Sequence, residues 1–150
     1  MTHPVIKKLQ LKDTEQPVLI LNAPKEYEDV IQSFPQEVHK ETKEEAYPLI
    51  QVFGTTNEAL QEATMKVFSK LAENGLLWLC YPKKSSKTYR GSNCSRETVA
   101  QLLAEAGFEP VRQVAIDDDW SALRFKHVDT IKTMTRSFAV TEAGKKRTEK

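Results

Sequence analysis

The chain has 150 residues, 39% of them hydrophobic and 29% charged, with a formal net charge of +1. This length and balance fit one soluble globular domain with a core of its own, and they exclude a disordered chain. The small net charge excludes a global field that would draw the protein onto nucleic acid or an anionic membrane.

The longest apolar run, residues 76–81, is far too short to cross a membrane. The amino terminus lacks the apolar stretch and cleavage site of a secretory signal, which favours a cytoplasmic protein. Two cysteines, Cys80 and Cys94, do not make a disulfide framework, and cytoplasmic thiols are normally reduced.

Short apolar runs alternate with amphipathic segments, a pattern typical of a sheet flanked by helices. In the first third we predict a short helix at residues 4–11, a buried strand at residues 18–21, and a helix that ends before Pro35. The polar segment 36–45 carries at most a short edge strand around Val38.

The middle of the chain contains the clearest elements. A strand at residues 49–53 is followed by an amphipathic helix with Thr56 or Asn57 as a candidate cap, and Asn74 with Gly75 is expected to end this helix. Residues 76–81 show no alternation, which predicts a strand buried on both faces of a parallel sheet.

The last third begins with a basic loop at residues 83–93. A helix is expected to start at Ser95 and to stop at Gly107. Strands at residues 111–116 and 121–128 are joined by a short loop, which implies an antiparallel pair.

These elements predict one three-layer α/β domain of Rossmann-like type over residues 1–128, with a mostly parallel sheet and an antiparallel strand near its end. Residues 129–150 read as a basic tail without a second domain.

The order of elements resembles the Rossmann-like fold of S-adenosylmethionine-dependent methyltransferases, and residues 68–79 resemble the stretch by which those enzymes enter a mid-sheet strand. The chain resembles more closely a bacterial family of small domains of this shape with no assigned activity. The resemblance covers about residues 5–126, and its matching segments are residues 18–24, 77–86, 114–117 and 120–125. It implies a methyltransferase-like fold and supplies no catalytic residues.

The turn after the first strand departs from the methyltransferases, because their glycine-rich cofactor loop is absent. Residues 22–24 are Asn, Ala and Pro, and the first glycine of the chain is Gly54. Tight turns that bring backbone amides up to a ligand use glycine, which has no Cβ. We therefore expect no cofactor.

Ligands of an open parallel sheet bind at the carboxyl ends of its strands, so residues that follow the strands should share one rim. The predicted ligand-binding residues on this rim are Asn22, Ala23, Lys83, Lys84, Ser85 and Ser86. With the helix start near Ser95, the basic loop could hold a phosphate or carboxylate. The alternative, which we favour, is a solvated basic loop.

Three further features have two interpretations each. Residues 117–119 are all Asp and could attract Mg²⁺ or Ca²⁺, but their spacing favours a turn. Trp120 and Arg124 are expected to form either a stacked or a buried pair that pins the terminal hairpin to the sheet. Cys94 lies near Arg96, a setting that lowers a thiol pKa, but without a nearby histidine we favour a spectator.

The sequence favours a non-catalytic ligand-binding or interaction module that keeps the methyltransferase shape. The alternative is an enzyme or sensor that binds a small anionic ligand, such as a phosphate, a nucleotide or an S-adenosylmethionine-like molecule, at residues 83–86. Nucleic-acid binding through the basic tail is weaker, because one short charged end lacks interleaved aromatic residues.

Overall fold

The computed structural model of the protein describes residues 4–11 and 15–127, except for the side chains of residues 73 and 74. The tail expected at residues 129–150 lies outside the described residues. The strands are β1 (Val18–Leu21), β2 (Val38–His39), β3 (Tyr47–Phe53), β4 (Leu71–Pro82), β5 (Phe108–Ala115) and β6 (Trp120–His127). The helices are α1 (Pro4–Lys8), η1 (Lys25–Tyr27), α2 (Glu28–Ser33), α3 (Asn57–Val67), η2 (Phe68–Lys70) and α4 (Arg96–Gln101), where η marks a 3₁₀ helix.

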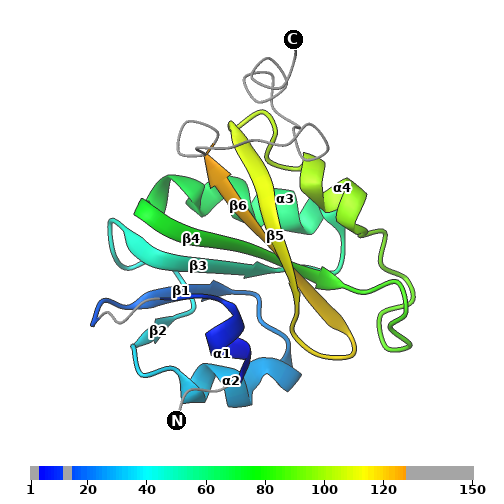
Figure 1. Ribbon diagram of the computed structural model, residues 1–150, viewed down its shortest axis with the longest axis horizontal. Helices are drawn as coiled ribbons and strands as arrows, with labels where there is room; N and C mark the ends of the chain where they lie inside the picture. Colours follow the sequence, from blue (N-terminus) through cyan, green and yellow to red (C-terminus); the bar gives the residue numbers. More distant parts are fainter. Residues whose placement is uncertain (1–3, 12–14, 128–150) are drawn as a thin grey trace.

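The described strands form one six-stranded sheet in the order β2-β1-β3-β4-β6-β5 (Figure 1). Strands β2, β1, β3 and β4 run parallel to one another, whereas β6 is antiparallel to both β4 and β5. The short loop between β5 and β6 leaves no room for a crossover, so these strands must run in opposite directions. The expected sheet, mostly parallel with an antiparallel strand near its end, is confirmed.

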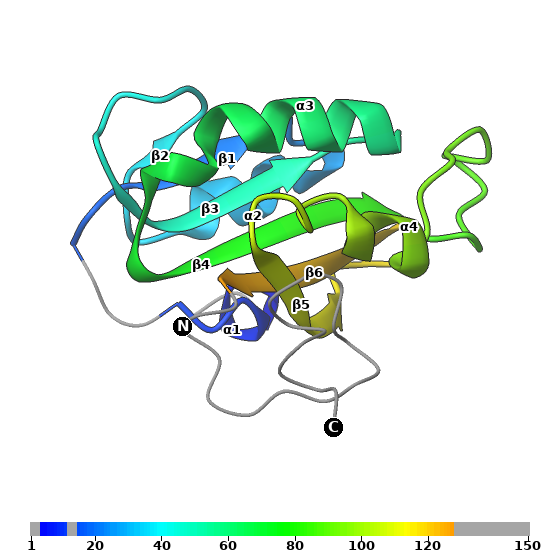
Figure 2. The same ribbon diagram turned by 90° about the horizontal axis from the view of Figure 1, so that it is seen from above.

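Two apolar clusters on opposite faces of the sheet make a three-layer structure. One face packs against α1, η1 and α2, and the other packs against α3 and α4. Figure 2 shows α3 and α1 on opposite sides of the strands. Residues 76–81 of β4 contribute to both clusters and none is more than 7% exposed, as the absence of alternation predicted.

The junction between α3 and β4 differs from the sequence expectation. The helix ends at Val67, one turn of 3₁₀ helix follows, and β4 already begins at Leu71. Leu71 pairs with Tyr47 and Leu76 pairs with Leu49, so β4 accommodates extra residues that include Asn74 and Gly75. The prediction that this pair ends the helix is wrong, because it marks an irregularity inside a strand whose register β3 fixes.

The helix expected from Ser95 does start there but is shorter than expected. It ends at Gln101, and a series of turns leads to Gly107, whose φ of 85° lies in the left-handed region that glycine tolerates. A Cβ at Gly107 would approach His127 Nε2 to 2.8 Å, so the position also requires a small residue.

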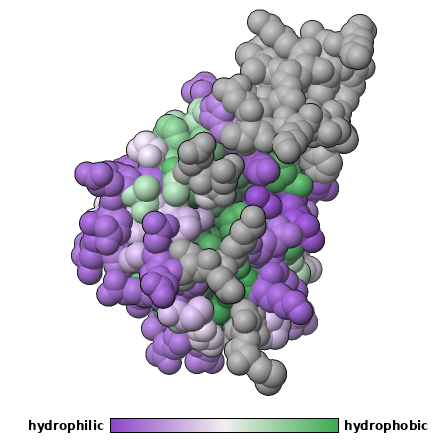
Figure 3. Space-filling view, turned by 60° about the vertical axis from the view of Figure 1, so that its left-hand side comes forward, coloured by the Kyte–Doolittle hydropathy of each residue, from purple (hydrophilic) through white to green (hydrophobic). Residues whose placement is uncertain are grey.

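The surface of the described chain offers little exposed apolar area. Figure 3 shows one face, on which hydrophilic side chains surround an apolar strip. Met65 is the one large hydrophobic residue classed as exposed among the described residues. None of the described helices is long and apolar enough to pass through a bilayer.

Candidate functional site

The strand order places the topological switch point between β1 and β3. From β1 the chain moves to β2 on one side, and it then returns to β3 on the other side. Ligands of open α/β sheets bind in the crevice that such a reversal creates at the carboxyl ends of the strands. Asn22 follows β1 and Gly54 follows β3 at this place.

The turn after β1 is tight although it contains no glycine. Asn22 has a φ of 59°, which is left-handed, and Ala23 and Pro24 lead directly into η1. Asparagine is the residue type other than glycine that adopts this conformation most readily. The absence of glycine therefore does not prevent a tight turn here, because Asn22 takes a position that a glycine could occupy.

Aromatic side chains of the chain itself fill the switch point on the α2 face. Tyr27 of η1 packs on Phe53 at the end of β3 with ring centroids 4.7 Å apart, and Phe53 packs on Trp120 of β6 at 5.3 Å. None of the three is more than 2% exposed. The Tyr27 hydroxyl also donates a hydrogen bond of 3.0 Å to Oε1 of the fully buried Gln51. A ligand that needs this space would have to displace the rings.

The loop between β4 and α4 covers the same region. Tyr89 packs on Trp120 with ring centroids 4.9 Å apart, and its hydroxyl donates to Glu26 Oε2. The Trp120 indole N–H donates to the same oxygen at 3.1 Å. These bonds, chiefly that of Tyr89, lower the pKa of Glu26, while burial and Glu26 raise the pKa of Tyr89 to about 12. The loop is thus tied to the segment that follows β1.

The amino end of α3, which could also hold an anion, is occupied by protein groups. Thr56 Oγ1 accepts from the Ala59 amide at 3.1 Å, and the Asn57 amide donates to Asn93 Oδ1 at 2.8 Å. The Asn93 side-chain amide in turn donates to the Glu58 carboxylate. Backbone amides at the start of a helix can bind an anion, but the amides of Asn57 and Ala59 already donate to protein acceptors.

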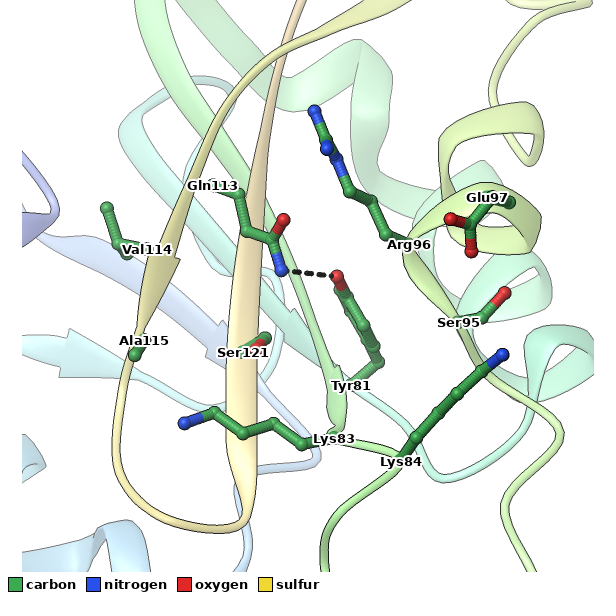
Figure 4. A pocket seen from close by; sticks show the side chains of 10 residues that line it. All are labelled: Tyr81, Lys83, Lys84, Ser95, Arg96, Glu97, Gln113, Val114, Ala115 and Ser121. Carbon is green, nitrogen blue, oxygen red and sulfur yellow. Dashed lines mark hydrogen bonds between the residues drawn. The ribbon is translucent and has the colours of Figure 1, made fainter.

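A pocket with a volume of about 580 Å³ opens on the same edge of the sheet, beyond β4 and on the α4 face (Figure 4). Tyr81, Ser121 and Ala115 form its floor, because the register places them side by side across β4, β6 and β5. The side-chain amide of Gln113 donates to the Tyr81 hydroxyl at 3.1 Å. This volume falls within the usual range of small-molecule sites.

Cationic side chains stand around this pocket. Lys83 and Lys84 follow β4, and Arg96 and Glu97 begin α4. Lys83 extends toward the β5 side and Lys84 toward Ser95, whereas Arg96 points away from both (Figure 4). Neither lysine forms an ion pair with a described carboxylate. The two lysines therefore place positive charge on two sides of the pocket, and the Glu97 carboxylate is the one acidic group among the lining residues.

The start of α4 contributes less than the sequence suggested. Ser95 Oγ accepts from the Thr98 amide at 3.2 Å, and Thr98 Oγ1 accepts from the Ser95 amide at 2.9 Å, which makes a capping box. The Glu97 carboxylate accepts from its own amide and from Ser95, and these bonds lower its pKa. The side chains of Ser95, Glu97 and Thr98 thus already use the hydrogen-bonding groups at the start of α4.

The predicted ligand-binding residues fall into separate places. Lys83 and Lys84 line the pocket. Ser85 is exposed and is not among the lining residues. Asn22 and Ala23 lie at the end of β1, and Ala23 packs against the apolar cluster of the α2 face.

Ser86 and the acidic turn stabilise the loop together. Ser86 is buried, and its hydroxyl donates to Asp119 Oδ1 at 2.8 Å and accepts from the Tyr89 amide at 3.1 Å. Asp117 Oδ1 accepts from the amides of Asp119 and Trp120, both at 2.8 Å. The turn interpretation of residues 117–119 is confirmed by these bonds. Within the described part of the chain, no group of three His, Cys, Asp or Glu residues is placed to hold a metal ion.

Two sequence predictions about single side chains need correction. Trp120 is buried against Phe53 and Tyr89, as the buried alternative expects. Arg124 does not stack on it, because four residues along a strand separate the two by about 13 Å. Arg124 instead donates to Gln10 Oε1 at 3.1 Å. Cys94 is buried, and burial raises its thiol pKa, so the lowered pKa considered from the sequence is wrong and the spectator interpretation fits.

The polar side chains beside Tyr81 are the part of the pocket that sequence reasoning missed. Gln113 comes from β5 and Ser121 from β6, and only the register of the strands brings them together with Tyr81 of β4. The one sequence signal for such residues is a polar side chain on the helix-facing side of an otherwise apolar strand. This signal does not show which residues of the neighbouring strands lie beside it.

Solved structures with a similar fold include methyltransferases. A protein in the NADB-Rossmann superfamily from Streptococcus agalactiae matches 85% of this chain and 69% of its own at 13% identity, with a TM-score of 0.51. N-methyltransferase NodS from Bradyrhizobium japonicum matches 82% of this chain and 92% of its own at 14% identity, with a TM-score of 0.53. Ribosomal protein L11 methylase from Lactobacillus delbrueckii subsp. bulgaricus matches 82% of this chain and 76% of its own at 11% identity, with a TM-score of 0.51. These likenesses establish the fold alone.

At the level of sequence, no curated protein matches the chain. A family model matches residues 25–129, which include every strand except β1. The chain therefore belongs to the family described as "Protein of unknown function (DUF3052)".

Proposed function

We propose that the protein is a non-catalytic ligand-binding module on a methyltransferase-like fold, and that it holds a small anionic molecule in the pocket between β4, β6, β5 and α4. The observation that carries this proposal is the pair of lysines, Lys83 and Lys84, beside a polar floor in a pocket of about 580 Å³. Carboxylate and phosphate groups are the ligands that such cations select.

The filled switch point supports a binding role that does not use S-adenosylmethionine. Tyr27, Phe53 and Trp120 occupy the place where an open sheet normally binds its nucleotide, and Tyr89 covers them. Displacing large buried aromatic side chains would cost several kcal/mol, by analogy with the 3–5 kcal/mol lost when one is truncated. We infer that this crevice stays closed.

The pocket chemistry supports binding more than catalysis. Burial raises the pKa of Tyr81 to about 12, which keeps its hydroxyl neutral at physiological pH and unsuited to act as a general base. Gln113 and Ser121 can form hydrogen bonds with a ligand but do not titrate. The expected ligand is therefore a small carboxylate or phosphate compound that also carries hydroxyl or amide groups.

The two buried free thiols support the cytoplasmic location that we infer from the sequence.

Thermal shift with citrate and with adenosine monophosphate at constant ionic strength tests the proposal. We expect at least one of these anions to raise the melting temperature of the protein, and the double variant Lys83→Ala, Lys84→Ala to lose this rise. Lys87→Ala is the matched control, because Lys87 is an exposed residue of the same loop that does not line the pocket. Equal responses of the double variant and the control would overturn the site. Calorimetric titration with S-adenosylmethionine should show no binding, and micromolar affinity would overturn the non-catalytic interpretation.

A further inference from the structure

Two arginines lie side by side on the face of the sheet opposite the pocket. Arg112 of β5 and Arg124 of β6 are direct partners in the antiparallel register. Like charges placed directly opposite one another in a sheet destabilise it. Arg112 is exposed and Arg124 is half-buried, so solvent screens this repulsion only in part.

No carboxylate compensates this pair within the described residues. The ion pairs found there involve neither arginine. Arg124 Nε is buried and has no hydrogen-bond partner, while Arg124 Nη1 donates to Gln10 at 3.1 Å. Burial, and next the neighbouring Arg112, lower the pKa of Arg124.

The end of α1 holds this arrangement in place. The Leu9 carbonyl accepts from the Trp78 indole N–H at 3.1 Å, and Lys8 Nζ donates to the Ala115 carbonyl at 2.9 Å. Gln10 has a φ of 63°, a left-handed conformation that costs free energy in a residue other than glycine. Its side chain meets Arg124, which lies between Trp78 and Arg112 in the row across β4, β6 and β5.

We propose that Arg112 and Arg124 form a binding site for a phosphate group. Two guanidinium groups match a phosphate monoester, which carries nearly two negative charges and three acceptor oxygens, better than a single carboxylate, which pairs with one guanidinium fork. The bound phosphate places negative charge between the two guanidinium groups, close to the buried Arg124 Nε but not in contact with it. This site lies on the other face of the sheet from the lysine pocket and does not depend on it.

The test combines two measurements on the Lys83→Ala, Lys84→Ala background, so that the lysine pocket cannot contribute. Inorganic phosphate is titrated at constant ionic strength, with acetate as the carboxylate arm. We expect phosphate at ten times its Kd to raise the melting temperature by roughly 2–5 °C, acetate to have little effect, and the Arg124 Nε–H signal in the ¹⁵N spectrum to move with phosphate.

Variants at Arg112 separate a binding role from a structural one. Without phosphate, Arg112→Gln should raise the melting temperature by roughly 1–3 °C because it removes the repulsion. With phosphate, both Arg112→Gln and Arg112→Lys should lose most of the rise, since lysine lacks the planar fork. Arg90→Gln, at an exposed arginine of the loop after β4, is the control and should keep it. The proposal is overturned if phosphate stabilises the Arg112 variants as much as their parent, if acetate acts as strongly as phosphate, or if the Arg124 Nε–H signal stays in place.

Discussion

Replacing Tyr27 with phenylalanine removes one hydrogen bond from the filled switch point and leaves the ring in place. The hydroxyl donates to Gln51 Oε1 at 3.0 Å, and Gln51 is fully buried, so no water can replace the donor. A buried acceptor without a partner costs roughly 1–3 kcal/mol. We therefore expect Tyr27→Phe to lower the free energy of unfolding by about 2 kcal/mol, with a fall of several degrees in melting temperature.

A double-mutant cycle with Gln51→Leu isolates this bond. Gln51→Leu alone leaves the Tyr27 hydroxyl without its acceptor, and it also removes the 3.3 Å contact between Gln51 Nε2 and Cys80 Sγ. The double variant leaves neither group unpaired, so its loss should be smaller than the sum of the single losses by about 1 kcal/mol. Urea unfolding followed by the fluorescence of the two buried tryptophans, Trp78 and Trp120, measures all four proteins. A strictly additive cycle, or a loss below about 0.5 kcal/mol for Tyr27→Phe, would refute the reasoning.

Three further predictions concern the edges of the fold. The Tyr47 hydroxyl accepts from the amides of residues 43 and 44, so it must donate to His39 Nδ1 at 2.8 Å. A long-range ¹H–¹⁵N spectrum should therefore show the neutral form of His39 protonated on Nε2. Protonation of this form on Nδ1 would contradict the bond. The pKa of Glu26 is lower in the folded protein than its ordinary value of 4.5, so ionised Glu26 stabilises the fold at any pH above 4.5. This stabilisation is lost as the pH falls from 4.5 through the lower pKa of the folded protein. Tyr89→Phe should therefore weaken the fall in melting temperature on acidification below that value, and an unchanged acid limb would argue against the bond. Ser95→Ala should cost about 1 kcal/mol in urea unfolding whereas Ser95→Asp keeps most of the cap, so equal losses would count against the capping box.

The fold could be predicted from local patterns because its elements bury regular apolar stripes. Residues 76–81 are apolar without alternating polar residues, which predicted a strand buried on both faces. The short loop after β5 predicted an antiparallel pair. The prediction failed where register outweighs local propensity. Asn74 and Gly75 carry a strong local signal for a helix end, but pairing with β3 draws the segment into β4.

The candidate site was predicted only in part, for a similar reason. Lys83 and Lys84 follow a strand end that the sequence shows, so their place on the rim could be anticipated. The closure of the switch point depends on Tyr89 and Trp120 meeting Glu26 from distant parts of the chain. Such contacts leave no periodic signal in the sequence, because they arise only after the sheet has formed.

The most direct test of the closed switch point and the open pocket is a ¹H–¹⁵N amide spectrum of the full chain, titrated separately with citrate and with S-adenosylmethionine. We expect citrate to move the amide signals of Lys83, Lys84 and Ser95, and S-adenosylmethionine to leave those of Asn22 and Gly54 in place. Saturable shifts of Asn22 and Gly54 with S-adenosylmethionine would contradict it.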